Sequence, residues 1–199
     1  LNINNNTWDK LTTDLKGYYY NRFGYNIDIN CDATNNSIYL ISSSPKHNGN
    51  TGKVDYYYWD STSWTLLYTL YGNGRNSYFG LEDIKINSEG NRFSIGNDIS
   101  NGKILSYRYK DGNIKQQGIS INGTNNSSNT GNAITLNNTG LILSTSYIKN
   151  NNNYVDSYYY HTEDLIEYIP EPEPTPVAEL YPEPVPEVES IPEPVPEPE

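Results

Sequence analysis

The residues with the greatest capacity for acid–base or metal chemistry are the two histidines and two acidic pairs. His47 lies in a loop rich in Gly and Asn and His161 at an expected strand corner, and neither has the spacing of a metal site or a catalytic triad. The pairs Glu82-Asp83 and Glu163-Asp164 would suit a retaining glycosidase only if two carboxylates faced each other about 5 Å apart. We expect all of these to be loop, turn or strand-edge residues, and we predict no catalytic residue, no metal ligand and no cofactor.

Composition excludes several classes of partner. Cys31 is the only cysteine, so an intrachain disulfide is excluded. The net charge of −11 is concentrated in residues 170–199, which hold nine Glu and no Lys or Arg, and the rest of the chain is close to neutral. Because phosphate contacts need clustered basic residues, we expect no nucleic-acid partner.

No apolar run of 18 residues occurs, so we expect no membrane span. The chain has neither Met nor a signal peptide, so we expect a processed chain or a fragment.

Asparagine is abundant and occurs in runs, as is typical of turns and loops. Several Asn-x-Ser/Thr sequons result, among them those that begin at Asn5, Asn35, Asn122 and Asn137. Two explanations stay open for them. They are glycosylation sites of a secreted protein, or they arise by chance in a chain whose genome favours Asn.

Three related segments recur along the chain. They are FGYNIDIN at 23–30, FGLEDIKIN at 79–87 and TGNAITLN at 130–137, and their glycines are 56 and 51 residues apart. A tryptophan stands 15 residues before the Phe of each of the first two segments, at Trp8 and Trp64. A period in the low fifties is too long for the common helical repeats and suits a unit of four strands.

Each repeat resolves into four short runs with strand character. In the first repeat these are YNIDIN at 25–30, SIYLISSS at 37–44, KVDYYYW at 53–59 and WTLLYTLY at 64–71. Alternation of apolar and polar positions and enrichment in Val, Ile, Thr, Tyr and Trp favour strands. The tyrosines of the third run recur at the same point of each repeat, which predicts that they pack between neighbouring sheets rather than form an exposed platform for sugars or bases.

Tandem four-stranded units are typical of a β-propeller, so we predict an all-β fold, a partial β-propeller of about three blades. The boundaries are a leading strand at 1–17 and three blades at 18–72, 73–122 and 123–169. Alternating Pro and Glu at 170–199 exclude helix and central strand and predict a disordered, polyproline-like stalk or linker. Docking of this tail on a domain that binds proline-rich peptides is the alternative.

Residues 1–169 resemble the FG-GAP repeat family, which includes the propeller of the integrin α-chain. The resemblance fades in the third copy. The matching residues are Phe23-Gly24, Phe79-Gly80, Ser44-Pro45, Gly52, Val54, Tyr58 and Trp64. It implies a propeller fold and a place at a cell or virion surface.

Integrin-type repeats carry a calcium loop of the form Asp-x-Asp-x-Asp-Gly, and this chain departs from it. The first copy has Asp28, Asn30 and Asp32, but Ala33 replaces the glycine on which the tight turn relies. The later copies keep fewer ligands; they read Lys85-x-Asn87-x-Glu89 and Thr135-x-Asn137-x-Thr139. We therefore expect a solvated turn rather than a calcium site.

Three blades do not close a ring, since propellers have four to eight. We therefore expect that upstream blades, or copies from several chains, complete it. The first hypothesis for function is a non-enzymatic extracellular or surface protein that binds a protein or glycan partner through loops such as 45–52, 72–78 and 122–130. The second is a structural module of a virion, sheath or cell wall, and the third is a carbohydrate-active enzyme.

Overall fold

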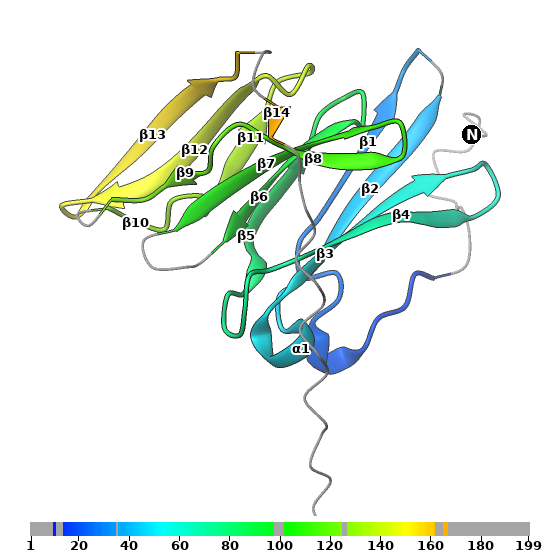
Figure 1. Cartoon of the computed structure of the whole chain (residues 1–199), viewed down its shortest axis with the longest axis horizontal. Helices are drawn as coiled ribbons and strands as arrows, with labels where there is room; N and C mark the ends of the chain where they lie inside the picture. Colours follow the sequence, from blue (N-terminus) through cyan, green and yellow to red (C-terminus); the bar gives the residue numbers. More distant parts are fainter. Residues whose placement is uncertain are drawn as a thin grey trace, which may run out of the picture.

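The described residues form three antiparallel β-sheets, which follow one another along the chain (Figure 1). The computed structural model describes Lys10 and residues 14–34, 36–97, 102–124, 127–161 and 165–166. The expected all-β fold class is therefore confirmed. Among these residues no helix combines the length and the apolar character needed to cross a membrane.

The first sheet is a meander of four strands in the order β1-β2-β3-β4. A single 3-10 turn, η1, precedes it, and a one-turn helix, α1, joins β2 to β3. The bounds are η1 Tyr19–Asn21, β1 Ile27–Asp32, β2 Ser37–Ser44, α1 His47–Asn50, β3 Lys53–Trp59 and β4 Trp64–Tyr71. These strands fall within two residues of the four predicted runs, because the alternating pattern on which the prediction relied is a local property of each strand.

The second sheet is a meander of β5, β6, β7 and β8, with two short strands added. Strand β9 pairs with β7, and β14 pairs with β8. The bounds are β5 Phe79–Ile86, β6 Arg92–Asn97, β7 Lys103–Lys110, β8 Asn113–Gln117, β9 Ile121–Asn122 and β14 Leu165–Ile166.

The third sheet contains β10, β11, β12 and β13, with β12 between the other strands. Its bounds are β10 Ser127–Ser128, β11 Ile134–Leu136, β12 Ile142–Lys149 and β13 Asn152–Tyr159. The predicted blade at 123–169 places residues 165–166 in this unit. They pair instead with β8, whose outer edge offers unpaired backbone groups. The predicted tail at 170–199 and most of the predicted leading strand lie outside the described residues.

The main core lies between the first and second sheets. Tyr56 is 1% exposed, and its hydroxyl donates a hydrogen bond of 2.8 Å to the carbonyl of Gly90. The Tyr56 ring contacts those of Phe93 and Tyr109 on the second sheet. Packing of the repeated aromatics between sheets is thus confirmed for the first copy. It is wrong for Tyr159 of the third copy, which is exposed because β13 is an outer strand.

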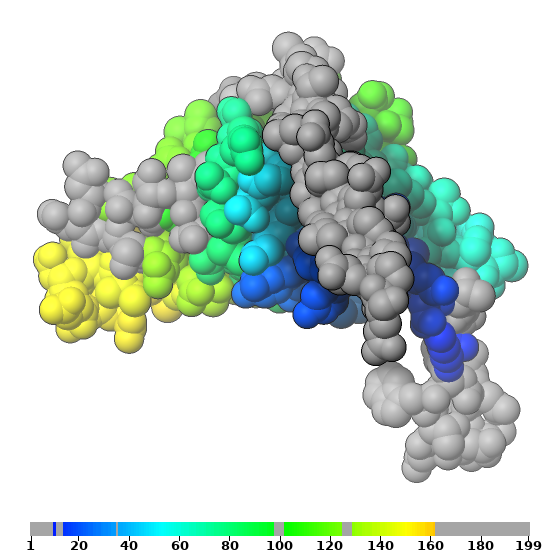
Figure 2. Space-filling view, turned by 90° about the horizontal axis from the view of Figure 1, so that it is seen from below, coloured from blue at the N-terminus to red at the C-terminus, as the bar shows by residue number. Residues whose placement is uncertain are grey.

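A smaller core joins the second and third sheets. It is formed by Ile104, Ile134 and Leu143. The first and third sheets therefore lie at opposite ends of the molecule, and Figure 2 shows β4 in cyan and the yellow third sheet at the two extremes.

Candidate functional site

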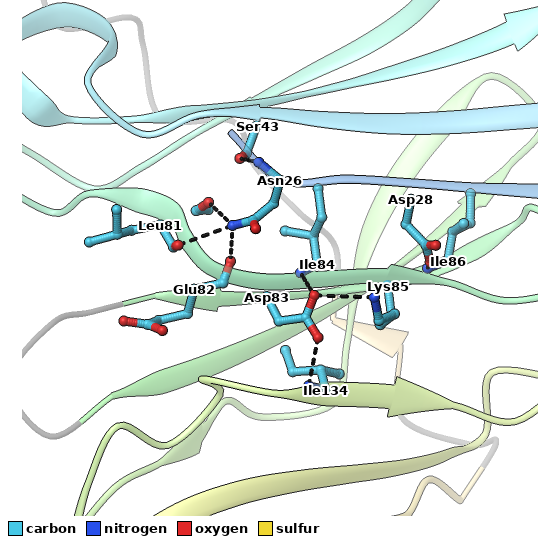
Figure 3. A network of polar contacts seen from close by, with 11 residues as sticks. Asn26, Asp28, Ser43, Leu81, Glu82, Asp83, Ile84, Lys85, Ile86 and Ile134 are labelled. Carbon is cyan, nitrogen blue, oxygen red and sulfur yellow. Dashed lines mark hydrogen bonds and ion pairs between the residues drawn. The ribbon is translucent and has the colours of Figure 1, made fainter. Parts of the chain in front are cut away.

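Asp28 and Asn30, two of the residues that most resemble calcium ligands, connect the first sheet to the second. Asp28 and Asn30 lie inside strand β1, so the expected solvated turn is wrong for both. One carboxylate oxygen of Asp28 accepts a hydrogen bond of 2.8 Å from the backbone N–H of Ile86 (Figure 3). The Asn30 amide donates one of 3.2 Å to the Ile86 carbonyl. Asp32 is the last residue of β1 and adjoins a turn, where its carboxylate accepts hydrogen bonds from the backbone N–H and the hydroxyl of Thr34.

Glu82 and Asp83, the acidic pair of the second repeat, also connect neighbouring sheets. Asp83 accepts a hydrogen bond of 2.9 Å from the backbone N–H of Ile134 on β11 and forms an ion pair of 3.2 Å with Lys85 (Figure 3). The backbone carbonyl of Glu82 accepts a hydrogen bond of 2.6 Å from the side chain of Asn26. Within the described part of the chain, no three His, Cys, Asp or Glu residues come close enough to hold a metal ion.

Two of the other aligned residues stabilise turns. The side-chain oxygen of Asn87 accepts a hydrogen bond of 2.8 Å from Arg92 N–H, and that of Asn137 accepts one of 3.0 Å from Ile142 N–H. Asn137 also begins a sequon, and its amide donates a hydrogen bond to the hydroxyl of Thr139. The Asn137 side chain is thus used in the turn, and a glycan on its amide nitrogen would compete with the bond to Thr139.

Loops 45–52 and 72–78, two of the three expected recognition loops, lie against each other. The N–H of Tyr78 donates a hydrogen bond of 2.8 Å to the carbonyl of Asn50, and the hydroxyl of Ser77 donates one of 2.6 Å to that of Thr51. These bonds link the start of β3 to the start of β5. The loops therefore join the two sheets, and their role in recognition stays a prediction.

The two histidines lie at different sheets. His47 begins α1, where its ring is 3.3 Å from the side-chain amide of Asn21 and packs on the ring of Tyr71. His161 follows β13, and its ring meets that of Tyr159 edge to face at 4.9 Å. His161 lines a cavity that sequence analysis missed.

This cavity lies between the second and third sheets and has a volume of about 620 Å³. Its walls are mostly aliphatic and aromatic. They are formed by Ser106, Gln117, Gly118, Ile119, Ile121, Leu136, Gly140, Leu141, Leu143, Tyr158, Tyr159, Tyr160 and His161. Because these residues come from four separated stretches of chain, no local motif could have identified the cavity.

A few polar groups line the cavity. Gln117 is 5% exposed, and its side-chain oxygen has no hydrogen-bond partner among the described residues. Burial and the adjacent Asp156 carboxylate raise the pKa of Tyr158, so its hydroxyl is neutral at physiological pH. Of the described residues that line the cavity, none carries a carboxylate. The arrangement suits binding of an uncharged, amphipathic ligand.

Comparison with known proteins places the chain in no family, since no family model and no curated protein matches it.

Proposed function

We propose that the chain is a non-enzymatic binding module of a surface or extracellular protein, in which the sheets are successive blades of an FG-GAP-like propeller. The cavity between the second and third sheets is its ligand site. The observation that carries this proposal is the combination of an apolar, tyrosine-rich wall with the buried oxygen of Gln117, which has no hydrogen-bond partner in the part of the chain that the structure describes. A buried acceptor without a partner is costly, and a ligand hydroxyl satisfies it.

A short glycan is the ligand class that we favour. Sugar rings have apolar faces that pack on aromatic side chains and hydroxyl groups that donate to acceptors such as Gln117. Tyr158 and Tyr159 both line the cavity and remain partly exposed, so their rings are accessible to a ligand.

The test is a glycan array probed with the full chain, followed by calorimetric titration of each glycan that binds. Tyr159→Ala should weaken binding about three- to tenfold, because an aromatic contact contributes about 0.5–1.5 kcal/mol. Tyr25→Ala is the matched control, since Tyr25 is also exposed but lies outside this cavity. Binding that is equally insensitive to both variants would refute this site, and a complete lack of glycan and cell-surface protein binding would refute the function.

A structural role in an assembly is the second candidate. Every residue of β13 is exposed, and strand edges of this kind pair readily with other chains. Concentration-dependent association in sedimentation experiments would favour this role, and a strictly monomeric chain would exclude it. A carbohydrate-active enzyme, the third hypothesis, would gain support from a carboxylate pair in the cavity, and the described residues that line it supply none, so we do not propose one.

A further inference from the structure

Strands β1, β5 and β11, called the inner strands here, have the same alternation of apolar and polar residues. The segments are NIDIN at 26–30, DIKIN at 83–87 and AITLN at 133–137, each with an aliphatic residue at its second and fourth positions. In the second sheet these aliphatic residues, Ile84 and Ile86, are 0% and 3% exposed because they pack against the first sheet.

The equivalent residues of the first sheet are exposed. Ile27 is 63% and Ile29 52% exposed. In the strand register, Ile29 lies opposite Leu40, which is followed by Tyr57 on β3 and Leu66 on β4. This row crosses the whole sheet on the face that points away from the second sheet. Leu66 at its end is 51% exposed, whereas Tyr57 in the middle of the row is only 9% exposed, so the exposed apolar surface lies toward the two edge strands.

Two hydrogen bonds join neighbouring sheets through a carboxylate, and in both the carboxylate belongs to the sheet that comes earlier in the chain. Asp28 of the first sheet accepts from the N–H of Ile86 in the second, and Asp83 of the second accepts from that of Ile134 in the third (Figure 3). The first and second sheets thus each offer a carboxylate to their successor, from different positions of the pattern, since Asp28 aligns with Lys85 and Asp83 aligns with Asn26. The aligned positions in the third sheet are Ala133 and Thr135, which have no carboxylate.

A second contact repeats with the same direction. Gly52 forms a parallel β-bridge with Phe79, and Gly102 forms one with Thr130. Both glycines have positive φ, and a Cβ atom would lie 2.4 Å from Phe79 N in the first case and 2.3 Å from Thr130 O in the second. Only glycine fits there.

In the third sheet, a tight turn stands at the place where the first and second sheets have the glycine of this bridge. Asn150 and Asn151 have φ of 50° and 62°, as in a type I′ hairpin, and connect β12 directly to β13. In the first sheet, by contrast, the side that would receive such a bridge is open. The loop before Phe23 corresponds to loop 72–78, but Tyr18, Tyr19 and Tyr20 on it are exposed rather than covered by a loop like 45–52.

We propose that the outer face of the first sheet is a docking surface for one further four-stranded sheet of the same repeat, whereas the third sheet lacks the carboxylate and the glycine that would hold a successor in the same way. The partner carries a carboxylate on its inner strand, at the place of Asp28, and a glycine where its third strand begins, at the place of Gly52. The repeated interface between the described sheets supports this partner, since its next copy would bury Ile27 and Ile29.

A second copy of this chain does not provide such a sheet. Its first and second sheets already offer their carboxylates and glycines to their own successors. Its third sheet has neither element at the aligned positions. The partner is therefore a repeat of the first or second type from another stretch of polypeptide, and identical copies do not close a ring.

The test lengthens the full chain by one repeat. A second copy of residues 18–72 is inserted in front of residue 18. Amide hydrogen exchange is then followed at Ile27 and Ile29 of the original copy, which is the copy that continues into residue 73. Exchange there should slow about tenfold or more, because the added sheet covers this face. The matched control carries the same 55 residues between residues 169 and 170, where strands β11 and β12 should exchange as before.

Two results would overturn the proposal: unchanged exchange at Ile27 and Ile29, or equal protection of the third sheet in the control. If the longer chain does not fold, the fluorescence of the apolar dye ANS on the unmodified chain decides. Ile29→Asp should reduce dye binding several-fold, whereas Val155→Asp on the third sheet should change it little. Equal effects of the two substitutions would refute an apolar docking face that is specific to the first sheet.

Discussion

Two isoleucines at equivalent positions should differ sharply in their contribution to stability. Ile84 is 0% exposed in the core between the first and second sheets, and Ile27 is 63% exposed on the outer face of the first. Truncation of a buried Ile to Ala costs about 2–5 kcal/mol, since it removes apolar contacts and leaves a cavity. We therefore expect Ile84→Ala to lower the free energy of unfolding by about 3 kcal/mol. Ile27→Ala should change it by less than about 0.5 kcal/mol.

Urea unfolding followed by Trp and Tyr fluorescence measures this difference. With a slope of about 2 kcal/mol per molar urea, the midpoint of Ile84→Ala should fall by about 1.5 M and that of Ile27→Ala by no more than about 0.25 M. Ile95, another fully buried residue in the same core, provides a positive control through Ile95→Ala. Equal midpoints for the Ile84 and Ile27 variants would refute the packing of the first sheet on the second that underlies these arguments.

Three further predictions concern the contacts between sheets. Asp83→Ala should destabilise the chain by about 1–3 kcal/mol, because the N–H of Ile134 loses its acceptor, and a urea midpoint equal to that of the wild type would contradict this role. Gly102→Ala should speed hydrogen exchange in the third sheet, since its Cβ would overlap Thr130 O; unaltered exchange would show that the bridge is dispensable. Burial raises the pKa of Tyr56 well above its usual value of 10.0, so the native state keeps a proton that the unfolded state loses. Stability should therefore be full below about pH 10 and fall as the pH rises above it, and Tyr56→Phe should flatten this decline in alkaline thermal melts. An equally steep decline in the Phe variant would assign the effect to other tyrosines.

Strand positions were predictable to a large extent, whereas the roles of polar residues were not. The runs at 37–44, 53–59 and 64–71 coincide with β2, β3 and β4, since alternation and β-branched or aromatic content are visible within a few residues. Asp28 resembled a metal ligand because its neighbours at alternate positions also carry oxygen. Its partner, Ile86 N–H, is 58 residues away, and only the packing of β1 beside β5 reveals it.

The cavity could not be found from sequence for the same reason. Gln117 and Tyr159 are ordinary strand residues in their local context, and they line one cavity only because the second and third sheets stack. The pairing of 165–166 with β8 likewise depends on which strand edge is free after the sheets have formed.

The amino-acid sequence by itself determined the all-β class and the positions of most strands in the first sheet, because side-chain alternation and turn residues act over a few positions. Tertiary structure alone decided which faces of those strands are buried. Ile27 and Ile84 are the same residue type in the same local pattern, yet one is exposed and the other has no exposed surface. The difference arises because burial depends on whether another sheet lies against that face, and no local pattern contains that information.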